Sequence, residues 1–475
     1  MTQMLIDNGD TLTQAEPWTS IEPGVTLDAM RERLDRDGIR FLLVQFVDML
    51  GAAKVKMIPA SSLDDAYSDG AGFAGAAVWG LGQGPHSHDM MARIDLASYT
   101  PIPWLPGTAR FAGDLFVDEV SYPYCVRTNL KRVLDSAREL GYVFNIGMEP
   151  EHFLVTKDEH GHLVPWNPDG VDSLEKPCYD YRSMAPAMSY LQELTSSLNS
   201  LGWGVYQADH EDANGQFEIN FDYTDALTTA DRVIFFKMAT SQLAKKYGAI
   251  ATHMPKPFPD RTGSGLHMHY HLADAASGEG LFTDEADPRD LGCSKLAYQF
   301  IAGVLDHAPA ICAVTSPTVN CYKRLQIGSG LYSSRSGYTW TPAFITYGDN
   351  NRTQMIRTAG PGHFEDRTVS AACNPYLGVA VYLAAGLDGI ARDLDPGDPN
   401  SANMYEKSPH EIASSGIDTL PQSLGEALAE LEKDSVVLDA MGPIAEEFIK
   451  VKTAEFADYR RQVTDWEVDR YLTSI

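Results

Sequence analysis

The clearest pattern of apolar and polar positions lies at residues 266–272, which read LHMHYHL. Successive side chains of a strand point to opposite faces, so this spacing predicts a strand with imidazoles on one face and apolar side chains on the other. The imidazoles belong to His267, His269 and His271. The Gly-Ser-Gly run at 263–265 predicts a loop just before this strand.

Residues 215–221, GQFEINF, show the same period of two with different polar groups. Apolar side chains alternate with Gln216, Glu218 and Asn220, and Glu211 lies a few residues upstream. The pattern predicts a strand with one face in the core and the other toward a wet cavity.

A third stretch, residues 143–155, reads VFNIGMEPEHFLV and places Glu149 and Glu151 on one strand face. Pro150, between them, indicates a sheet edge or a bend, because proline cannot donate to a strand ladder. Each polar face alone is also typical of a solvated surface. Taken together, the strands predict a cavity lined by carboxylates and imidazoles without thiolates, which favours Mg²⁺ or Mn²⁺ over structural zinc.

Helical spacing of apolar residues separates these strands. The predicted helices are residues 27–38, 128–141, 187–202 and 230–248. Further predicted strands are residues 41–51, 54–60 and 109–118, and the Gly/Ala-rich segment 68–89 is predicted as a loop. Long helices and strands interleave without a short, regular βα rhythm, which favours an α+β fold with a curved antiparallel sheet. The expected division is a polar tail at 1–20, a small α+β domain at 21–120 and a large domain at 121–475.

The composition is that of an ordinary globular protein, but the net charge of the 475 residues is −28. This charge argues against nucleic acid or an anionic membrane as a partner, whereas it permits attraction of metal ions or amines. Six scattered cysteines without a CxxC pair predict free thiols in a reducing compartment. The apolar stretch at 376–387 is too short to cross a bilayer and the first residues lack a signal-peptide pattern, so we expect a soluble, cytoplasmic protein.

Four arginines lie in polar surroundings rich in Gly or Asn: Arg324, Arg352, Arg357 and Arg367. Guanidinium groups match phosphate and carboxylate oxygens, although a surface ion pair also explains any one arginine in an acidic protein. The chain has no GxxxxGK(S/T) motif, which excludes a P-loop nucleotidase. Divalent metals and several arginines together fit the needs of phosphoryl transfer.

Seven motifs resemble, in order and spacing, those of the glutamine synthetase superfamily, over about residues 37–410. They are MEPEHFL, HEDANGQFEIN, MPKPFPDRTGSGLHMHYHL, PTVNCYKRL, NNRTQMIR, FEDR and NPYL. The resemblance implies a small β-grasp-like N-terminal domain and a larger catalytic domain. It also implies a homododecamer of two hexameric rings, with active sites between adjacent subunits.

By position in these motifs, the resemblance assigns a role to most of the polar residues above. One metal would have the ligands Glu151, Glu211 and Glu218 and another Glu149, His267 and Glu365, with two or three Mg²⁺ or Mn²⁺ ions per active site. Gly263, Arg324 and Arg367 resemble glutamate-binding residues, and Arg352 resembles the arginine at the transferring phosphate. Tyr223, His269, His271 and Arg357 occupy positions on the nucleotide side.

The implied reaction is ATP-dependent ligation of L-glutamate to an amine. ATP converts the γ-carboxylate, a poor electrophile, to an acyl phosphate, which the neutral amine then attacks. Ammonium and alkylammonium ions hold their proton near neutral pH, so a carboxylate must remove it. Asp48 resembles the carboxylate that a neighbouring subunit contributes, and its alternative role is that of a turn aspartate beside Gly51.

The chain departs from ammonia-using relatives after YKRL. Where they carry a glutamate six residues beyond the arginine, this chain has Gly330. Tyr332, Tyr338 and Trp340 follow nearby and could surround an alkyl or aryl group. Within the superfamily the chain therefore most resembles the γ-glutamylmethylamide synthetases (glutamate–methylamine ligases) of methylamine and nitrogen metabolism. Ammonia, as in glutamine synthetase itself, and isopropylamine, ethanolamine or aniline-type amines remain alternatives. The segment after YKRL is poor in carboxylates. This argues against polyamines, because their second charge would need an acidic partner.

Three other positions differ from the family pattern: Thr262, His271 and His363. They leave the glutamate and metal residues in place and concern the nucleotide contacts. A catalytically silent assembly is a further alternative, but it predicts loss of ligands or arginines that this chain retains. Tyr405 stands where some relatives are adenylylated, and a tyrosine is also frequent there without modification.

Overall fold

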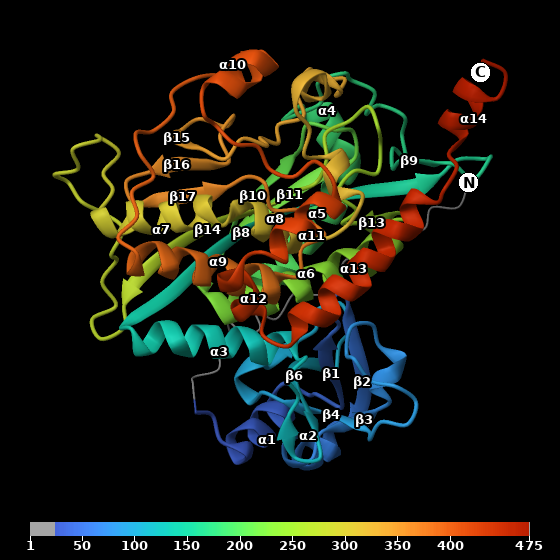
Figure 1. Ribbon diagram of the computed structural model, residues 1–475. Helices are drawn as coiled ribbons and strands as arrows, with labels where there is room; N and C mark the ends of the chain where they lie inside the picture. Colours follow the sequence, from blue (N-terminus) through green and yellow to red (C-terminus); the bar gives the residue numbers. More distant parts are fainter. Residues whose placement is uncertain (1–23, 475) are drawn as a thin grey trace, which may run out of the picture.

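The computed structural model describes residues 24–474, and the predicted tail at 1–20 lies outside them. Two β-sheets organise this part of the chain: a seven-stranded sheet that ends at Ser121 and a ten-stranded sheet that begins at Tyr142. In Figure 1 the smaller sheet and its two helices lie together at one end of the molecule, in blue. This arrangement is consistent with the predicted domain boundary near residue 120, which stays a prediction.

The seven-stranded sheet has the strand order β2-β1-β6-β4-β3, with β5 and β7 also paired to β6. Its strands are β1 (Phe41–Val47), β2 (Ala53–Pro59), β3 (Ala71–Phe73), β4 (Met90–Ile94), β5 (Thr100–Pro101), β6 (Thr108–Val117) and β7 (Val120–Ser121). Leu42, Val44 and Phe46 alternate along β1 and are buried. They form one core with helices α1 (Leu27–Arg36) and α2 (Leu63–Ser68).

The ten-stranded sheet has the order β10-β11-β8-β14-β17-β16-β15, and β9, β12 and β13 also pair with β8. Its strands are β8 (Tyr142–Lys157), β9 (Leu163–Pro165), β10 (Val205–His210), β11 (Gln216–Phe221), β12 (Thr224–Asp225), β13 (Ile250–Thr252), β14 (Leu266–Asp274), β15 (Tyr347–Asp349), β16 (Ile356–Gly360) and β17 (His363–Asp366). All its pairs are antiparallel except β15 with β16, so the prediction of an antiparallel sheet is confirmed.

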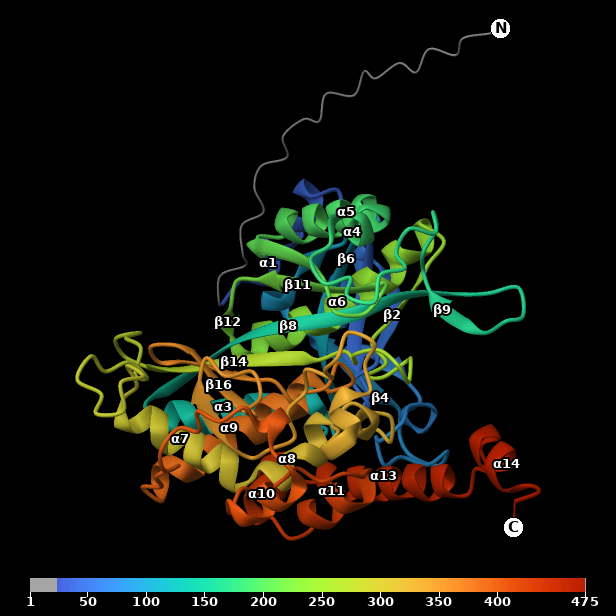
Figure 2. The same cartoon turned by 90° about the horizontal axis from the view of Figure 1, so that it is seen from above.

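The larger sheet packs against long helices. The remaining α-helices are α3 (Val126–Glu139), α4 (Tyr181–Met184), α5 (Met188–Ser200), α6 (Ala226–Lys246), α7 (Lys295–Asp306), α8 (Ala308–Thr315), α9 (Pro375–Ala391), α10 (Pro409–Ser414), α11 (Leu424–Leu431), α12 (Ser435–Met441), α13 (Ile444–Arg460) and α14 (Asp465–Tyr471). Helices α3 and α6 contact β8, and α9 packs against α3, α7 and α12. Figure 2 shows α13 and α14 extending along one side of the molecule toward the C-terminus.

The four predicted helices are present, with differences at their ends. Helix α6 begins at Ala226 rather than at residue 230, because the Asp225 side chain caps it by accepting from the backbone N–H of Thr228. The segment 68–89, predicted as a loop, contains the short strand β3, which pairs with β4.

The sequence suggested that Pro150 marks a sheet edge or a bend. It does not lie at an edge, because β8 is a central strand of the sheet. The N–H of the next residue, Glu151, bonds to the carbonyl of Gly265 on the β14 side, so the donor that proline lacks would point toward β11. Pairing with β11 begins only at Glu151, opposite Glu218. The proline therefore costs the sheet no ladder hydrogen bond.

Among residues 24–474, no single helix is long and apolar enough to cross a bilayer. Helices α7 and α8 meet the criteria of length and composition only as a pair, with a bend of 73° between them. Most of the side chains of this pair are buried in the core. The six cysteines are free in the structure, as predicted.

Candidate functional site

The polar faces of β8, β11 and β14 line one cavity of about 730 Å³. The opposite faces are buried in the core, as the alternating patterns predicted, and Leu266, Met268 and Leu272 of β14 are nearly inaccessible. The cavity is lined by the predicted metal ligands and the predicted arginines: Glu149, Glu151, Glu211, Glu218, His267, Glu365, Arg324, Arg352, Arg357 and Arg367. Residues far apart in the sequence thus meet at one place.

Strand register brings the predicted ligands side by side. His267 of β14 lies opposite Glu149 of β8. On the other side of β8, Glu151 lies opposite Glu218 of β11. Directly opposed side chains on neighbouring strands are within reach of each other. These four residues can therefore act together as ligands of metal ions.

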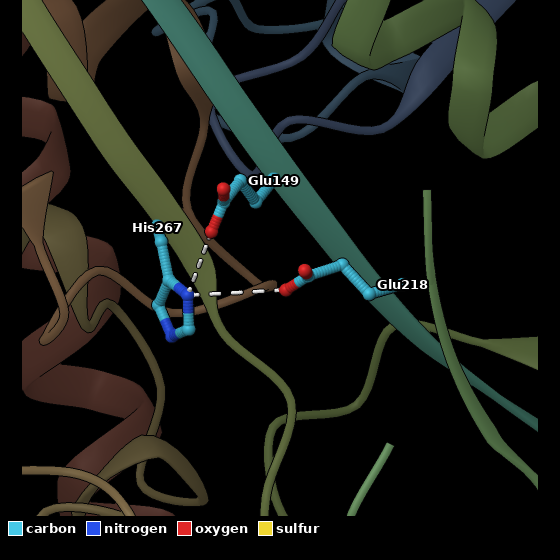
Figure 3. Close-up of side chains that lie close together, drawn as sticks. All are labelled: Glu149, Glu218 and His267. Carbon is cyan, nitrogen blue, oxygen red and sulfur yellow. Dashed lines mark hydrogen bonds and ion pairs between the residues drawn. The ribbon is translucent and has the colours of Figure 1, made fainter. Parts of the chain in front are cut away.

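His267 approaches several of these carboxylates, and Figure 3 shows one of its ring nitrogens facing Glu149 and Glu218. Its Nδ1 lies 3.3 Å from Oε2 of Glu149 and 3.9 Å from Oε2 of Glu218. The same nitrogen is 3.5 Å from Oε1 of Glu365, and Nε2 is 3.3 Å from Oε1 of Glu151. Glu149, Glu218 and His267 offer ligand atoms within 4.8 Å of one another, close enough to hold one cation.

A second set of ligand atoms, from Glu149, His269 and Glu365, also fits within 4.8 Å. Nε2 of His269 is 3.1 Å from Oε1 of Glu149. Glu365 enters from β17, where it lies opposite His269. The geometry therefore makes His269 a further candidate metal ligand, whereas the sequence indicated only a contact with the nucleotide.

Burial and mutual repulsion set the charge of these carboxylates. Burial and the neighbouring carboxylate of Glu151 raise the pKa of Glu211 to about 8. Burial and Glu149 also raise the pKa of Glu218 well above its ordinary value. Among the described residues, neither Glu211 nor Glu218 forms an ion pair with Lys or Arg. A divalent cation would supply the missing positive charge, so the donor set fits the predicted metal ions.

Glu365 differs from these carboxylates because two arginines already neutralise it. Nη1 of Arg367 donates to Oε1 at 2.5 Å, and Nη1 of Arg357 donates to Oε2 at 2.8 Å. Although burial opposes the shift, Arg367 lowers the pKa of Glu365 to about 2. Arg357 also donates to the side-chain oxygen of Asn350. These charge-assisted bonds fix both guanidinium groups at the cavity wall.

Gln216 positions Glu151, a role that the sequence did not reveal. Its Nε2 donates to Oε2 of Glu151 at 2.9 Å, and the N–H of Gly265 donates to the same oxygen at 3.0 Å. Thr262, one of the departures from the family pattern, donates to Oε1 of Gln216 at 3.0 Å. The place of Gln216 on the polar face of its strand was the signal for a site residue, but its partner depended on the fold.

Gly263 lies where the loop before β14 passes close to other groups. A Cβ there would lie 2.3 Å from the carbonyl oxygen of Pro255 and 3.0 Å from Cγ of Arg324, so the position requires glycine. Arg324 donates to the carbonyl oxygens of Thr368 and Arg367. Nε of Arg324 and Nε of Arg367 are buried without a partner among the described residues. Both arginines line the cavity, where an anionic substrate can satisfy these donors.

A second pocket of about 380 Å³ adjoins the first and shares Glu149 with it. Of the residues predicted on the nucleotide side, Tyr223, His269 and His271 line this pocket, whereas Arg357 lines the larger cavity. His363, where the family pattern has an arginine, also lines the pocket, with Nε2 2.7 Å from Nδ1 of His269. Burial and His269 lower the pKa of His363 to about 4, so its neutral ring can accept a hydrogen bond from His269.

Asp48 does not line either pocket of its own chain. It is buried at the turn between β1 and β2, where Oδ1 accepts from the N–H of Leu50 at 3.0 Å and of Ala52 at 2.9 Å. Its Oδ2 lies 3.0 Å from Nζ of Lys54. Within one chain Asp48 therefore has the turn role that the sequence offered as the alternative. Its contribution to a neighbouring subunit stays a prediction.

Of the three aromatic residues predicted to surround the amine, Trp340 alone lines the cavity. Tyr332 and Tyr338 contact Tyr405 instead. The Tyr332 hydroxyl donates to the carbonyl oxygen of Tyr405 at 2.6 Å, and the Tyr338 ring stacks on the Tyr405 ring at 5.6 Å between centroids. Within one chain, packing turns Tyr332 and Tyr338 toward Tyr405, and their place beside the amine stays a prediction. The Tyr405 hydroxyl is buried and inaccessible to a modifying enzyme in this structure.

The cavity also contains residues that the sequence analysis did not single out: Tyr179, Tyr206, Asp209 and Asp212. Tyr179 lies in the segment before α4 and has a φ of 59°, in the left-handed region. No periodic pattern marks that segment, so the fold alone places it at the cavity. Asp212 directly follows Glu211 in the sequence, and this neighbour was the only feature that could have indicated Asp212 as a cavity residue.

Comparison with known proteins finds a family and relatives that span most of this chain. Residues 123–471 match the family model described as the catalytic domain of glutamine synthetase. A glutamate–methylamine ligase from Methyloversatilis universalis is 47% identical over 440 residues, which cover 92% of this chain and 97% of that protein. A glutamine synthetase from Rhizobium meliloti is 38% identical, over 90% of this chain and 96% of its own. A solved structure of a GmaS/ADP complex superposes with a TM-score of 0.86 at 40% identity, over 93% of this chain and 99% of that chain.

The candidate ligands and arginines that the motifs suggested thus lie together on the expected fold. The family model spans most of the chain, and the curated relatives match it almost from end to end. The chain therefore belongs to the glutamine synthetase family of ATP-dependent acid–amine ligases.

Proposed function

We propose that this protein ligates L-glutamate to methylamine at the expense of ATP, through a γ-glutamyl phosphate, giving N-methylglutamine, ADP and phosphate. The observation that carries the proposal is the contact between two pockets that share Glu149. One pocket holds carboxylates and arginines suited to an acidic substrate and phosphoryl transfer, and the other is suited to a nucleotide. The relative named glutamate–methylamine ligase supports methylamine as the amine.

We assign Mg²⁺ or Mn²⁺ ions to the carboxylates around His267. Glu151, Glu211 and Glu218 would hold one ion, and Glu149, His267 and Glu365 another, with His269 beside the second. All these donors are carboxylate oxygens or imidazole nitrogens, the ligand types that such ions accept. When bound, the ions neutralise charge on the phosphates of the nucleotide and orient them.

The chain's own groups would bind and orient the anionic substrates. Arg324 and Arg367 would hold the γ-carboxylate of glutamate and its phosphorylated form through their buried, unpaired Nε donors. The backbone of the loop at Gly263 would receive the α-amino group. Burial and the nearby charges of Arg357 and Arg367 lower the pKa of Arg352, and a transferring phosphate beside it would relieve this repulsion.

The smaller pocket would hold the nucleotide. Tyr223 is exposed at its edge, and His269 and His271 extend into it from β14. His269 lies between the two pockets because it also approaches Glu149. It can therefore contact the phosphates at the point where the nucleotide meets the larger cavity. The similar structure of an ADP complex supports a nucleotide as the ligand.

Deprotonation of the incoming alkylammonium would require a second subunit. Asp48 is our candidate base, and it lies away from both pockets of its own chain. We therefore propose that residues 21–120 of one subunit meet residues 121–475 of the next in a cytoplasmic homododecamer of two hexameric rings. Light scattering would measure the assembly, and a stable monomer with full activity would contradict it.

Phosphate release that depends on glutamate and Mg²⁺-ATP tests the proposed function. Methylamine, ammonium, ethylamine, isopropylamine, ethanolamine and aniline are compared in parallel. We expect a higher kcat/KM for methylamine than for ammonium. Preference for ammonium would make the protein a glutamine synthetase, and preference for another amine would replace methylamine in the proposal. No release with any amine would contradict a ligase.

A further inference from the structure

The segment 328–341 carries an unusual backbone position. Trp340 has a φ of 57°, in the left-handed region that large side chains rarely adopt. Its side chain is 40% exposed and lines the substrate cavity. A tryptophan held in a rare conformation at a substrate cavity points to a function for that position.

Asp212 lies beside Trp340 in the cavity lining. The Asp212 carboxylate lies within electrostatic reach of the Trp340 side chain, and it accepts a hydrogen bond from the hydroxyl of Ser336. Asp212 lines the same cavity and directly follows Glu211, a candidate metal ligand. One carboxylate therefore ties the segment 328–341 to the edge of the metal site.

Other contacts support the indole from outside the cavity. The Tyr338 ring meets the Trp340 ring edge to face, with 5.6 Å between centroids, and itself stacks on Tyr405. Farther out, Nε of Arg335 lies 2.8 Å from the carboxylate of Asp260. The indole thus packs against Tyr338 with the Asp212 carboxylate nearby, and its remaining surface is available to the cavity.

This arrangement has the chemistry that recognises an alkylammonium ion. An aromatic face attracts the cation and buries its methyl group, while a carboxylate balances its charge. Trp340 supplies the face and Asp212 the carboxylate, and Tyr179, which is also exposed, lines the same cavity. Ammonium has no methyl group to bury, and one buried methyl is worth about tenfold or more in discrimination.

We propose that Trp340 selects a substituted amine over ammonium, and that Asp212 is the positioning residue that holds its indole against the amine. The inference rests on the proposed ligase function. It moves amine selectivity away from Gly330, which does not line the cavity. A Cβ at Gly330 would instead lie 2.6 Å from the side-chain oxygen of Gln326.

Two substitutions of Trp340 test the aromatic face. Trp340→Gly removes the ring at a φ that glycine adopts without strain, and Trp340→Asn removes it with a residue that tolerates this region. We expect the ratio of kcat/KM for methylamine to that for ammonium to fall about tenfold in both. A higher KM for methylamine should carry the change, with the KM for glutamate unaltered.

A pair of substitutions tests Asp212. Asp212→Ala frees the indole, so the ratio should fall as it does without the ring. Asp212→Asn keeps an oxygen acceptor for the indole N–H, and its lost charge weakens the binding of ammonium and methylammonium alike, so most of the wild-type ratio should be recovered. Equal ratios in these two variants would show that Asp212 does not act through a hydrogen bond to Trp340.

Arg335→Ala is the matched control within the same segment. It breaks the contact with Asp260 but removes nothing from the cavity lining. We expect the wild-type amine ratio in this variant. A fall as large as that of Trp340→Gly would mean that selectivity follows the general order of the segment, and the inference would be overturned.

Formation of γ-glutamyl hydroxamate from hydroxylamine separates this inference from the proposed function. Hydroxylamine has no alkyl group, so hydroxamate reports that a variant is folded and activates glutamate. A wild-type amine ratio in a Trp340 variant that still makes hydroxamate would overturn the role of Trp340. Should both Trp340 variants lose hydroxamate, the Asp212 pair decides. No hydroxamate from the wild-type protein would refute the proposed function instead.

Discussion

Of the three groups of histidine and carboxylate side chains with the spacing of a metal site among the described residues, two that share no residue differ in charge balance. They are Glu149–Glu218–His267 in the cavity and Asp306–His307–Asp388 on helices α7 and α9 and the junction of α7 with α8. In the cavity, Glu218 is buried and has no Lys or Arg partner among the described residues. Burial and Glu149 raise its pKa, so this cluster is stabilised by an added cation.

The helix cluster already contains its positive charges. Nδ1 of His307 lies 2.6 Å from Oδ2 of Asp434, and Nε2 lies 3.0 Å from Oδ2 of Asp388. Nη1 of Arg392 donates to Asp306 and to Asp388, both at 2.7 Å. Burial opposes protonation of His307, but its hydrogen bonds to Asp434 and Asp388 raise its pKa. Uncompensated negative charge at Glu218, rather than ligand spacing, therefore distinguishes this cavity cluster from the helix cluster.

The largest effect is expected from Glu218→Gln, which keeps the size of the side chain and removes a charged ligand. Loss of a residue that only hydrogen-bonds to a metal ligand costs about 10–100-fold in metal affinity or activity. Loss of the ligand Glu218 should therefore lower both Mn²⁺ affinity, measured by electron paramagnetic resonance, and ligation activity by more than this. Asp388→Asn is the matched change in the helix cluster and should leave both unaltered. Equal losses in the two variants would remove the distinction between the clusters.

Arg367→Lys tests the guanidinium that neutralises Glu365 in the cavity. A lysine cannot keep the contact with Glu365 and also offer a fixed donor to the substrate. We expect kcat to fall about 10²–10³-fold, as on loss of one donor to a developing negative charge, with Mn²⁺ affinity nearly retained. Steady-state kinetics at saturating glutamate measure the first effect. A normal kcat would contradict the role proposed for Arg367.

His307→Ala should lower stability without affecting catalysis. The loss should be about 2 kcal/mol, in the range of hydrogen bonds to charged groups. Because the pKa of His307 is raised in the folded state, its contribution is complete below the ordinary histidine pKa of about 6.5 and declines as pH rises through the folded value. The Tm difference between wild type and variant should therefore narrow as pH rises. A difference that widens, or a loss of ligation activity, would contradict this role.

Arg392→Ala should have the smallest effect. The side chain is about half exposed, so solvent screens its ion pairs and they contribute little to stability. We expect no additional Mn²⁺ per subunit, because both ring nitrogens of His307 stay paired with carboxylates. An extra bound Mn²⁺ would show that the charge of Arg392 alone separates the helix cluster from a metal site.

Much of the cavity could be predicted from the sequence, because the pleat of a strand decides which side chains share a face. The period of two placed Glu149 and Glu151 together, and it separated Glu218 from its buried neighbours. The helix cluster around His307 had no such signal. Its members come from separate helices and a loop, and only helix packing brings them together.

The sequence by itself determined the polar strand faces, the types of ligand on them and the family to which the motifs point. The tertiary structure decided that His267 lies opposite Glu149, that Arg367 neutralises Glu365, and that Asp212 contacts Trp340 while Tyr332 turns away to Tyr405. The reason is physical. A face follows from the local geometry of neighbouring residues, whereas register and contacts between distant segments follow from how the whole core packs.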